Sequence, residues 1–205
     1  MRVVVLASAG YASNSYLIVD DVSKTFAVVD PSVDTSFAKT YIDDGFSLKY
    51  VLLTHGHFDH IFYVDEWRSL GGKVCIHKGD ADFLNDPSKS LYLQFFARDI
   101  RHGDADVILS DGDWLCLGDN MIKVLSTPGH TKGSVCYLFD NVMLSGDTLF
   151  AGTIGRTDLY GSSDSDMKNS IEKLSAIDTD YVVYPGHGDK TTLFYEKQHS
   201  RYLHN

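Results

Sequence analysis

Short apolar runs recur along the chain, and turn-forming residues separate them. Runs of this kind, flanked by glycine, proline or polar residues, are typical of buried strands. We therefore expect strands at 1–7, 16–19, 26–29, 50–53, 73–76, 107–109, 121–125, 135–139, 142–144 and 181–184. The polar segment 20–24 separates the second run from the third, as the turn of a hairpin does.

Apolar residues recur at helical spacing in other segments, and we expect helices at 33–44, 61–70, 166–177 and 191–203. The first segment stops at Gly45 and the second at Gly71, and glycine commonly follows the end of a helix. Segment 79–105 is mixed, and we expect two short helices and a loop there.

Helices alternate with strands in both halves of the chain, without a linker or a shift in composition. This rhythm predicts a single α/β domain that spans 1–205. Two sheets packed together and covered by helices fit the pattern, and a doubly wound sheet fits it as well. Periodicity alone leaves both architectures open.

The composition narrows the choice of function. The 205 residues include 18 Lys and Arg and 28 Asp and Glu, which gives a formal net charge of −10. Such an acidic chain is a poor match for a phosphate backbone, so we expect no nucleic-acid partner. No apolar run approaches the ~18 residues that span a membrane, and the N-terminus lacks a signal-peptide pattern, so we expect no membrane partner. Cys75, Cys116 and Cys136 lie among apolar neighbours, which predicts buried, reduced thiols and a cytoplasmic protein.

A dense cluster of histidines follows the strand expected at 50–53. The segment reads Thr54-His55-Gly56-His57-Phe58-Asp59-His60. Burying three unpaired imidazoles and a carboxylate would cost several kcal/mol, so a purely structural role is disfavoured. The segment therefore indicates a metal site.

Three later strands end in a similar way, in a glycine-containing turn with one histidine or aspartate. These turns contain His130, Asp147 and His187. With the first cluster they make five histidines and two aspartates. This set is too large for one tetrahedral zinc ion, and it suits two metals about 3.5–4 Å apart with one bridging carboxylate.

These motifs together resemble the metallo-β-lactamase superfamily. Segments 146–150 (GDTLF) and 155–159 (GRTDL) further resemble the glyoxalase II-like hydrolases. The resemblance implies a four-layer αββα sandwich of two mixed sheets, with the metals at one edge. It assigns His55, His57 and His130 to the first metal, and Asp59, His60 and His187 to the second. Asp147 would bridge the metals together with a hydroxide, and Asp59 would help to orient that hydroxide.

The implied function is hydrolysis of a small-molecule thioester, such as a hydroxyacyl-glutathione, by a monomer or homodimer holding two divalent metals. We expect zinc, and iron or manganese also fits these ligands. Arg156 would bind a substrate carboxylate, or it would pair with Asp158 and hold the loop. A thiolate leaves readily, so the motifs need no separate general acid.

Three alternatives remain open. A persulfide dioxygenase would use a single iron held by two histidines and one aspartate. A lactonase would add a tyrosine near the metals, for which Tyr11, Tyr160 and Tyr195 are candidates. A binding protein without activity would have lost some of the metal ligands, whereas this sequence has a histidine or aspartate at all seven ligand positions.

Several features depart from the full glyoxalase II pattern. The chain ends soon after His187, so we expect no separate C-terminal helical substrate domain. Phe62 either narrows the pocket or packs inward. The aromatic segment 92–96 forms either a lid or a helix packed on the core. The remaining histidines have no expected site role; they are His77, His102, His199 and His204.

Overall fold

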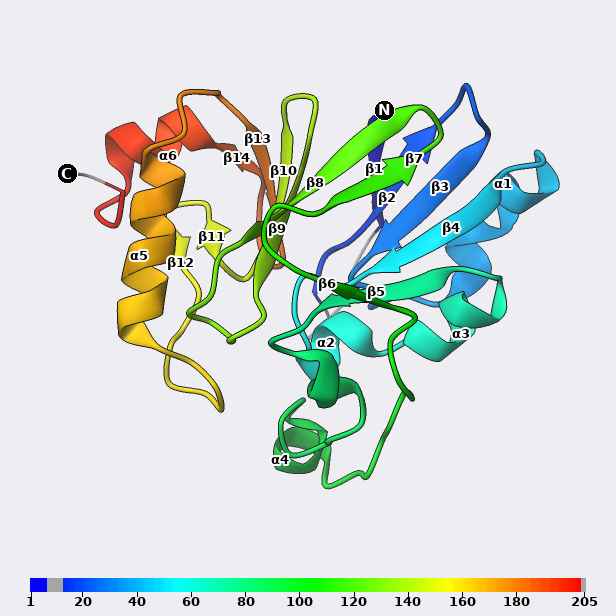
Figure 1. The fold of residues 1–205 in the computed structure, drawn as a ribbon, viewed down its shortest axis with the longest axis horizontal. Helices are drawn as coiled ribbons and strands as arrows, with labels where there is room; N and C mark the ends of the chain where they lie inside the picture. Colours follow the sequence, from blue (N-terminus) through cyan, green and yellow to red (C-terminus); the bar gives the residue numbers. More distant parts are fainter. Residues whose placement is uncertain (7–12, 204–205) are drawn as a thin grey trace.

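The computed structural model describes residues 1–6 and 13–203. Two six-stranded sheets lie face to face, and helices cover their outer faces (Figure 1). This arrangement confirms the four-layer αββα sandwich, and the doubly wound alternative is wrong.

The first sheet contains the N-terminal strands in sequence order. They are β1 (Arg2–Leu6), β2 (Ser15–Asp20), β3 (Thr25–Val29), β4 (Ser47–Leu52), β5 (Lys73–His77) and β6 (Val107–Leu109). Strands β2 and β3 form the expected antiparallel hairpin, and β3 to β6 run parallel. The parallel strands therefore end at the same edge of the sheet.

The second sheet has the order β14-β13-β10-β9-β8-β7. Its strands are β7 (Trp114–Leu117), β8 (Asn120–Ser126), β9 (Val135–Phe139), β10 (Val142–Gly146), β13 (Val182–Pro185) and β14 (Thr191–Thr192). Strands β10 and β13 are parallel and the other pairs are antiparallel, so this sheet is mixed too. A short hairpin joins β11 (Leu149–Phe150) to β12 (Thr153–Ile154).

Apolar side chains fill the spaces between the four layers. Strand β2 shows how one strand serves two of these spaces, because successive side chains point to opposite faces. Leu17 and Val19 join the cluster beneath the helices of the first sheet, whereas Tyr16 and Ile18 join the cluster between the sheets. The third cluster lies between the second sheet and the helices α5 (Asp164–Ser175) and α6 (Leu193–His199).

The helix expected at 61–70 is divided. Helix α2 (Phe58–Ile61) ends before α3 (Val64–Ser69) begins. The N–H of Tyr63 donates to the carbonyl of Pro31 (2.9 Å), and this tertiary bond replaces a helical one. The segment 33–44 is likewise divided, into the 3-10 helix η1 (Thr35–Ala38) and α1 (Lys39–Asp43). Segment 79–105 contains two short helices as expected, η2 (Ala81–Leu84) and α4 (Tyr92–Phe96).

The prediction of three buried thiols is wrong at one position. Cys75 and Cys136 are buried, but Cys116 is exposed. Strand β7, which the sequence analysis did not identify, lies at the edge of its sheet. Leu115 and Leu117 point inward there, so Cys116 points outward. No helix in the described part of the chain is long and apolar enough to cross a membrane.

Candidate metal centre

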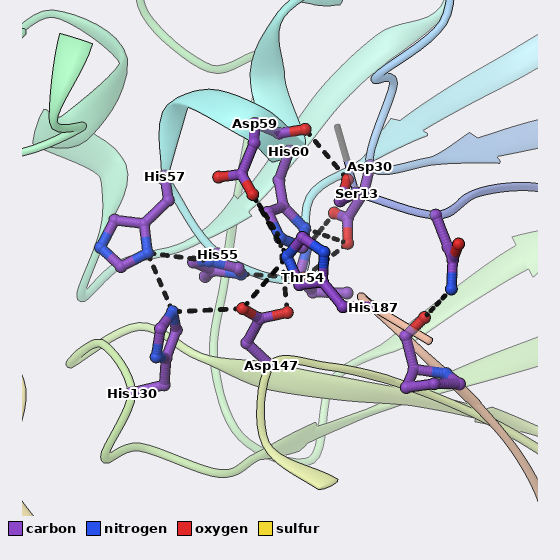
Figure 2. Close-up of polar contacts among 12 residues, drawn as sticks. Ser13, Asp30, Thr54, His55, His57, Asp59, His60, His130, Asp147 and His187 are labelled. Atoms are coloured by element: carbon purple, nitrogen blue, oxygen red, sulfur yellow. Dashed lines mark hydrogen bonds and ion pairs between the residues drawn. The ribbon is translucent and has the colours of Figure 1, made fainter. Parts of the chain in front are cut away.

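Loops at the ends of four strands bring the seven candidate ligands together. The loop after β4 contributes His55 and His57, and the short helix α2 that follows contributes Asp59 and His60. The loops after β8, β10 and β13 contribute His130, Asp147 and His187. Figure 2 shows these side chains pointing toward one another. His55, His57, His60 and His130 are each at most 3% exposed, so folding has moved these imidazoles out of water.

The first group consists of His55, His57 and His130, whose ligand atoms lie within 4.8 Å of one another. Nδ1 of His57 lies 3.1 Å from Nε2 of His55 and 2.9 Å from Nε2 of His130. Three ring nitrogens thus converge on one point, as the ligands of one metal do.

Hydrogen bonds behind the rings decide which nitrogens carry protons. The hydroxyl of Thr54 donates its hydrogen to Asp30 (2.7 Å), so Nδ1 of His55 donates to that hydroxyl (3.1 Å). Nδ1 of His130 donates to a backbone carbonyl (2.9 Å). Both Nε2 atoms therefore present lone pairs to His57, whose single Nδ1 cannot donate to both. A bound cation would satisfy the converging lone pairs, so the residues present fit a metal.

The second group consists of Asp59, His60 and His187. Oδ2 of Asp59 lies 3.2 Å from Nε2 of His187 and 3.8 Å from Nε2 of His60. The backbone carbonyl of Asp59 accepts hydrogen bonds from the hydroxyls of Ser13 and Ser32, which fix the loop at this point.

Asp147 lies between the two groups. Its Oδ2 is 3.5 Å from Nε2 of His130 and 3.6 Å from Nε2 of His187, and its Oδ1 is 3.4 Å from Nε2 of His60. Oδ1 of Asp147 and Nε2 of His60 are buried without a hydrogen bond. Two buried polar atoms that face each other without a hydrogen bond are expected where a bound ion would contact both of them.

Burial and charge divide the histidines into two kinds. Burial lowers the pKa of His55 well below its ordinary value and that of His57 to about 3, so both rings are neutral at pH 7. Burial also disfavours the charged form of His60. The negative charges of Asp147, Asp30 and Asp59 outweigh this effect, so the pKa of His60 is raised well above its ordinary value. For Asp147, burial opposes the charge as well, and His60 nevertheless holds its pKa below the usual range.

Two supporting carboxylates were missed in the sequence analysis. Asp30 follows β3 and accepts a hydrogen bond from Nδ1 of His60 (2.9 Å). Asp80 accepts from the backbone N–H groups of Gly56 (3.0 Å) and Gly133 (2.7 Å), so it joins two ligand-bearing loops. Asp30 had a signal, since it ends an apolar strand as the ligands do. No such sequence signal marks Asp80, because its hydrogen-bond partners are distant in sequence.

Gly186 has a steric role beside the ligands. A Cβ at this position would overlap Oδ1 of Asp147 and lie 2.7 Å from Cε1 of His60. The backbone of the PGHG turn therefore approaches the centre more closely than any other residue type allows.

A cavity of about 770 Å³ opens beside the cluster, and Arg156 contributes to its wall. The guanidinium donates to both carboxylate oxygens of Asp158, at 2.6 and 2.8 Å, which is the loop-holding pair considered above. Phe62 packs inward against the ring of Phe58 (5.6 Å). Helix α4 packs on the core through Tyr92, which is buried, as one of the two interpretations expected, and its Phe95 lines the cavity.

None of the other candidates that the structure describes is part of the described lining of the cavity. Tyr160 and Tyr195 are exposed, and Tyr11 and His204 lie outside the described residues. His102 is buried and bonds to Tyr92 and Asp65, so it has a packing role. His77 is also buried, and His199 stacks on the ring of Tyr195 (4.2 Å).

Curated relatives align with most of the chain. An uncharacterized protein of Mycobacterium leprae is 38% identical, over 93% of this chain and 93% of its own. The probable metallo-hydrolase YqgX of Bacillus subtilis is 32% identical, over 93% and 92%. The probable polyketide biosynthesis zinc-dependent hydrolase PksB of the same species is 34% identical, over 87% and 74%.

Solved structures share the fold. The BLEG-1 B3 metallo-beta-lactamase matches with a TM-score of 0.91 and 31% identity, covering 100% of both chains. ETHE1 from Myxococcus xanthus matches with a TM-score of 0.80 and 25% identity, covering 98% of this chain and 84% of its own. TTHA1623, solved in a di-iron-bound form, matches with a TM-score of 0.80 and 28% identity, covering 96% and 98%.

The family model of the metallo-beta-lactamase superfamily matches residues 9–187, a range that includes every candidate ligand. By this match, and by the His and Asp cluster at the edge of its sandwich, the chain belongs to the metallo-beta-lactamase superfamily.

Proposed function

We propose that this metallo-hydrolase cleaves a thioester, using two divalent metals held by the seven side chains. The observation that carries the proposal is the make-up of the cavity. Its described lining consists of cluster members, apolar side chains and Arg156. The hydrogen bond to Asp158 raises the pKa of Arg156, so this guanidinium keeps its protons. The thiol released from a thioester has a pKa of about 8.5, so its thiolate leaves readily from such a site without a separate general acid.

The proposed roles of the ligands follow from their positions. His55, His57 and His130 would hold the first metal, and Asp59, His60 and His187 the second, with Asp147 shared between them. When bound, the two cations would lower the pKa of a shared water and polarise the substrate carbonyl. Zinc is our first choice, supported by the zinc-dependent relative PksB, and the di-iron form of TTHA1623 supports iron as well.

The chain's own residues would position the reactants. Asp59 is 3.2 Å from His187 and faces the cavity, so its carboxylate is placed to accept a proton from a nucleophilic water. Asp30 holds the His60 ring, and Asp80 ties the loop of His57 to the loop of His130. Apolar walls would keep bulk water away from the carbonyl. Arg156 would contact the substrate from the wall, and the glyoxalase II-like part of this proposal is the bond that is cleaved, a thioester.

One observation favours a second candidate, a persulfide dioxygenase with a single iron. His55, His60 and Asp147 form a further group whose ligand atoms lie within 4.8 Å of one another. Two histidines and one carboxylate are the ligand set of non-haem iron oxygenases. The similarity to ETHE1 lends this candidate some support.

Parallel assays on one preparation separate the two functions. The purified protein, reconstituted with zinc or with ferrous iron, is given thioesters in one assay and glutathione persulfide with an oxygen electrode in the other. Thiol release without oxygen uptake is expected, and it should follow occupancy by two metals. Oxygen uptake by the iron form, with no thiol release, would overturn the proposal in favour of the dioxygenase.

A further inference from the structure

The cavity beside the metal cluster has an apolar wall that contains none of the candidate metal ligands. Six apolar side chains line it: Phe58, Leu91, Phe95, Phe96, Phe150 and Leu159. The wall begins directly at the cluster, because Phe58 stands between the ligands His57 and Asp59 in the sequence. A substrate whose carbonyl lies at the cluster therefore places its neighbouring atoms against apolar surface.

This wall is packed in advance of any ligand. The rings of Phe95 and Phe96 each lie 5.1 Å from the ring of Phe58, and Phe62 packs behind at 5.6 Å. Tyr92, which is fully buried, lies 6.0 Å from Phe58 and anchors helix α4 to the core. A ligand would meet a fixed surface, so little ordering accompanies its binding.

The backbone holds Phe95 and Phe96 in the wall of the cavity in a strained arrangement. Leu91 and Ala97, which flank helix α4, both adopt left-handed conformations, with φ of 71° and 52°. Residues with a Cβ rarely adopt this conformation, and such strain persists where a function requires it. The two phenylalanines remain 53% and 42% exposed, although burial would stabilise them. Both observations are explained if a ligand covers these rings.

The charge of the wall indicates what kind of ligand this is. Arg156 is the permanent cation among the described lining residues, and its guanidinium is engaged by both oxygens of Asp158. An anionic group would have to displace this carboxylate. An uncharged apolar group would bury its surface against the wall without displacing Asp158.

We propose that the wall binds the acyl chain of the substrate, so that the enzyme selects thioesters of apolar acids of medium length over short hydroxyacyl thioesters. This inference rests on the proposed thioester hydrolysis. Each methylene that enters the wall should raise kcat/KM about threefold, until the cavity is filled. Octanoyl thioesters should therefore exceed acetyl thioesters by at least about a hundredfold.

The test uses the metal-loaded enzyme and thioesters of one uncharged thiol, N-acetylcysteamine, with acetyl, butyryl, hexanoyl and octanoyl groups. Phe95→Ala and Phe96→Ala should each lower the ratio between the kcat/KM values of the octanoyl and acetyl esters about tenfold. Phe37→Ala is the matched control, because Phe37 is 41% exposed and does not line the cavity. It should change neither value.

A binding measurement separates failure of this inference from failure of the proposed function. Octanoate should bind the metal-loaded protein at least about tenfold more tightly than acetate, and Phe95→Ala should remove most of the difference. If no thioester is cleaved but octanoate is preferred, the hydrolytic proposal fails and the apolar site stands. If thioesters are cleaved at rates independent of chain length and octanoate binds no better than acetate, the acyl site is overturned.

Discussion

Nδ1 of His60 donates a 2.9 Å hydrogen bond to the carboxylate of Asp30, and both groups are buried. The same carboxylate accepts the backbone N–H and the hydroxyl of Thr54, each at 2.7 Å. These bonds fix the ring, so that Nε2 of His60 faces Asp147 at 3.4 Å. A carboxylate behind a histidine ligand sets both its tautomer and its orientation.

Replacing Asp30 should weaken the metal site without changing a ligand. Asp30→Asn puts an amide group among three donors, so one of them loses its acceptor. We expect metal affinity to fall about 10–100-fold, as measured by competition with a chelator. Asp178→Asn is the control, since Asp178 is exposed beyond the end of α5, and it should have no effect. Equal affinity in the two variants would show that Asp30 does not support the site.

Asp80 should contribute to stability and to the first metal group together. It accepts from Gly56 (3.0 Å), from Gly133 (2.7 Å) and from the hydroxyl of Thr131 (2.6 Å), although burial raises its pKa to about 6. Asp80→Asn should lower the free energy of unfolding by about 1–3 kcal/mol, because a buried donor loses its partner. Urea unfolding measures this change. Asp82→Asn, at an exposed carboxylate nearby, should cost much less, and an equal cost would contradict the assigned role.

Metal binding should release a proton from His60. Asp147, Asp30 and Asp59 raise its pKa well above the ordinary value despite its burial, so in metal-free protein the ring is charged at pH 7. His55 and His57 have lowered pKa values and release none. Apparent affinity should therefore rise with pH until the pKa of His60 is reached. Calorimetry in buffers of different ionisation enthalpy should report release of at least about one proton per chain at pH 7, one from His60 and any further proton from water that the metals ionise. A value near zero would mean that His60 is neutral.

His57→Ala should abolish turnover and leave the fold largely intact. The ring supplies one of the three converging nitrogens, so its loss removes a ligand of the first group. The circular dichroism spectrum should match the wild type while the metal content falls. His199→Ala serves as the control, because His199 packs on Tyr195 away from the cluster. Wild-type activity in His57→Ala would exclude the assigned site.

The three cysteines should differ sharply in reactivity. Burial raises the pKa of Cys75 to about 12 and of Cys136 to about 11, whereas Cys116 is exposed. Since the thiolate is the reactive form, native protein should react with a thiol reagent at Cys116 alone. Unfolded protein should react at all three positions. Rapid labelling of Cys75 or Cys136 in native protein would contradict the structure.

The sequence predicted most strands because apolar runs between turns have few alternatives. It predicted the convergence of the candidate ligands because each ligand-bearing segment follows the end of a strand, β4 in the first sheet and β8, β10 and β13 in the second. Strand β7 was missed although Trp114–Leu117 is an unbroken apolar run of four residues. Its exposed face, with Trp114 and Cys116, appears only in the structure.

What the sequence could not supply depends on contacts between distant segments. The break between α2 and α3 arises from the bond of Tyr63 to Pro31, and no local pattern encodes that bond. Asp80 lies far in sequence from Gly133, and their bond appears only when the two sheets come together. The pairing of Arg156 with Asp158 was one of two interpretations that the sequence allowed.

The metal content of the protein tests the central claim most directly. Protein purified without chelators and reconstituted with zinc should contain two metal ions per chain by mass spectrometry. Asp147→Ala should lower this content, because Asp147 reaches His130 in one group and His60 and His187 in the other. Protein that binds no zinc, or one ion that survives the loss of Asp147 unchanged, would contradict the two-metal centre.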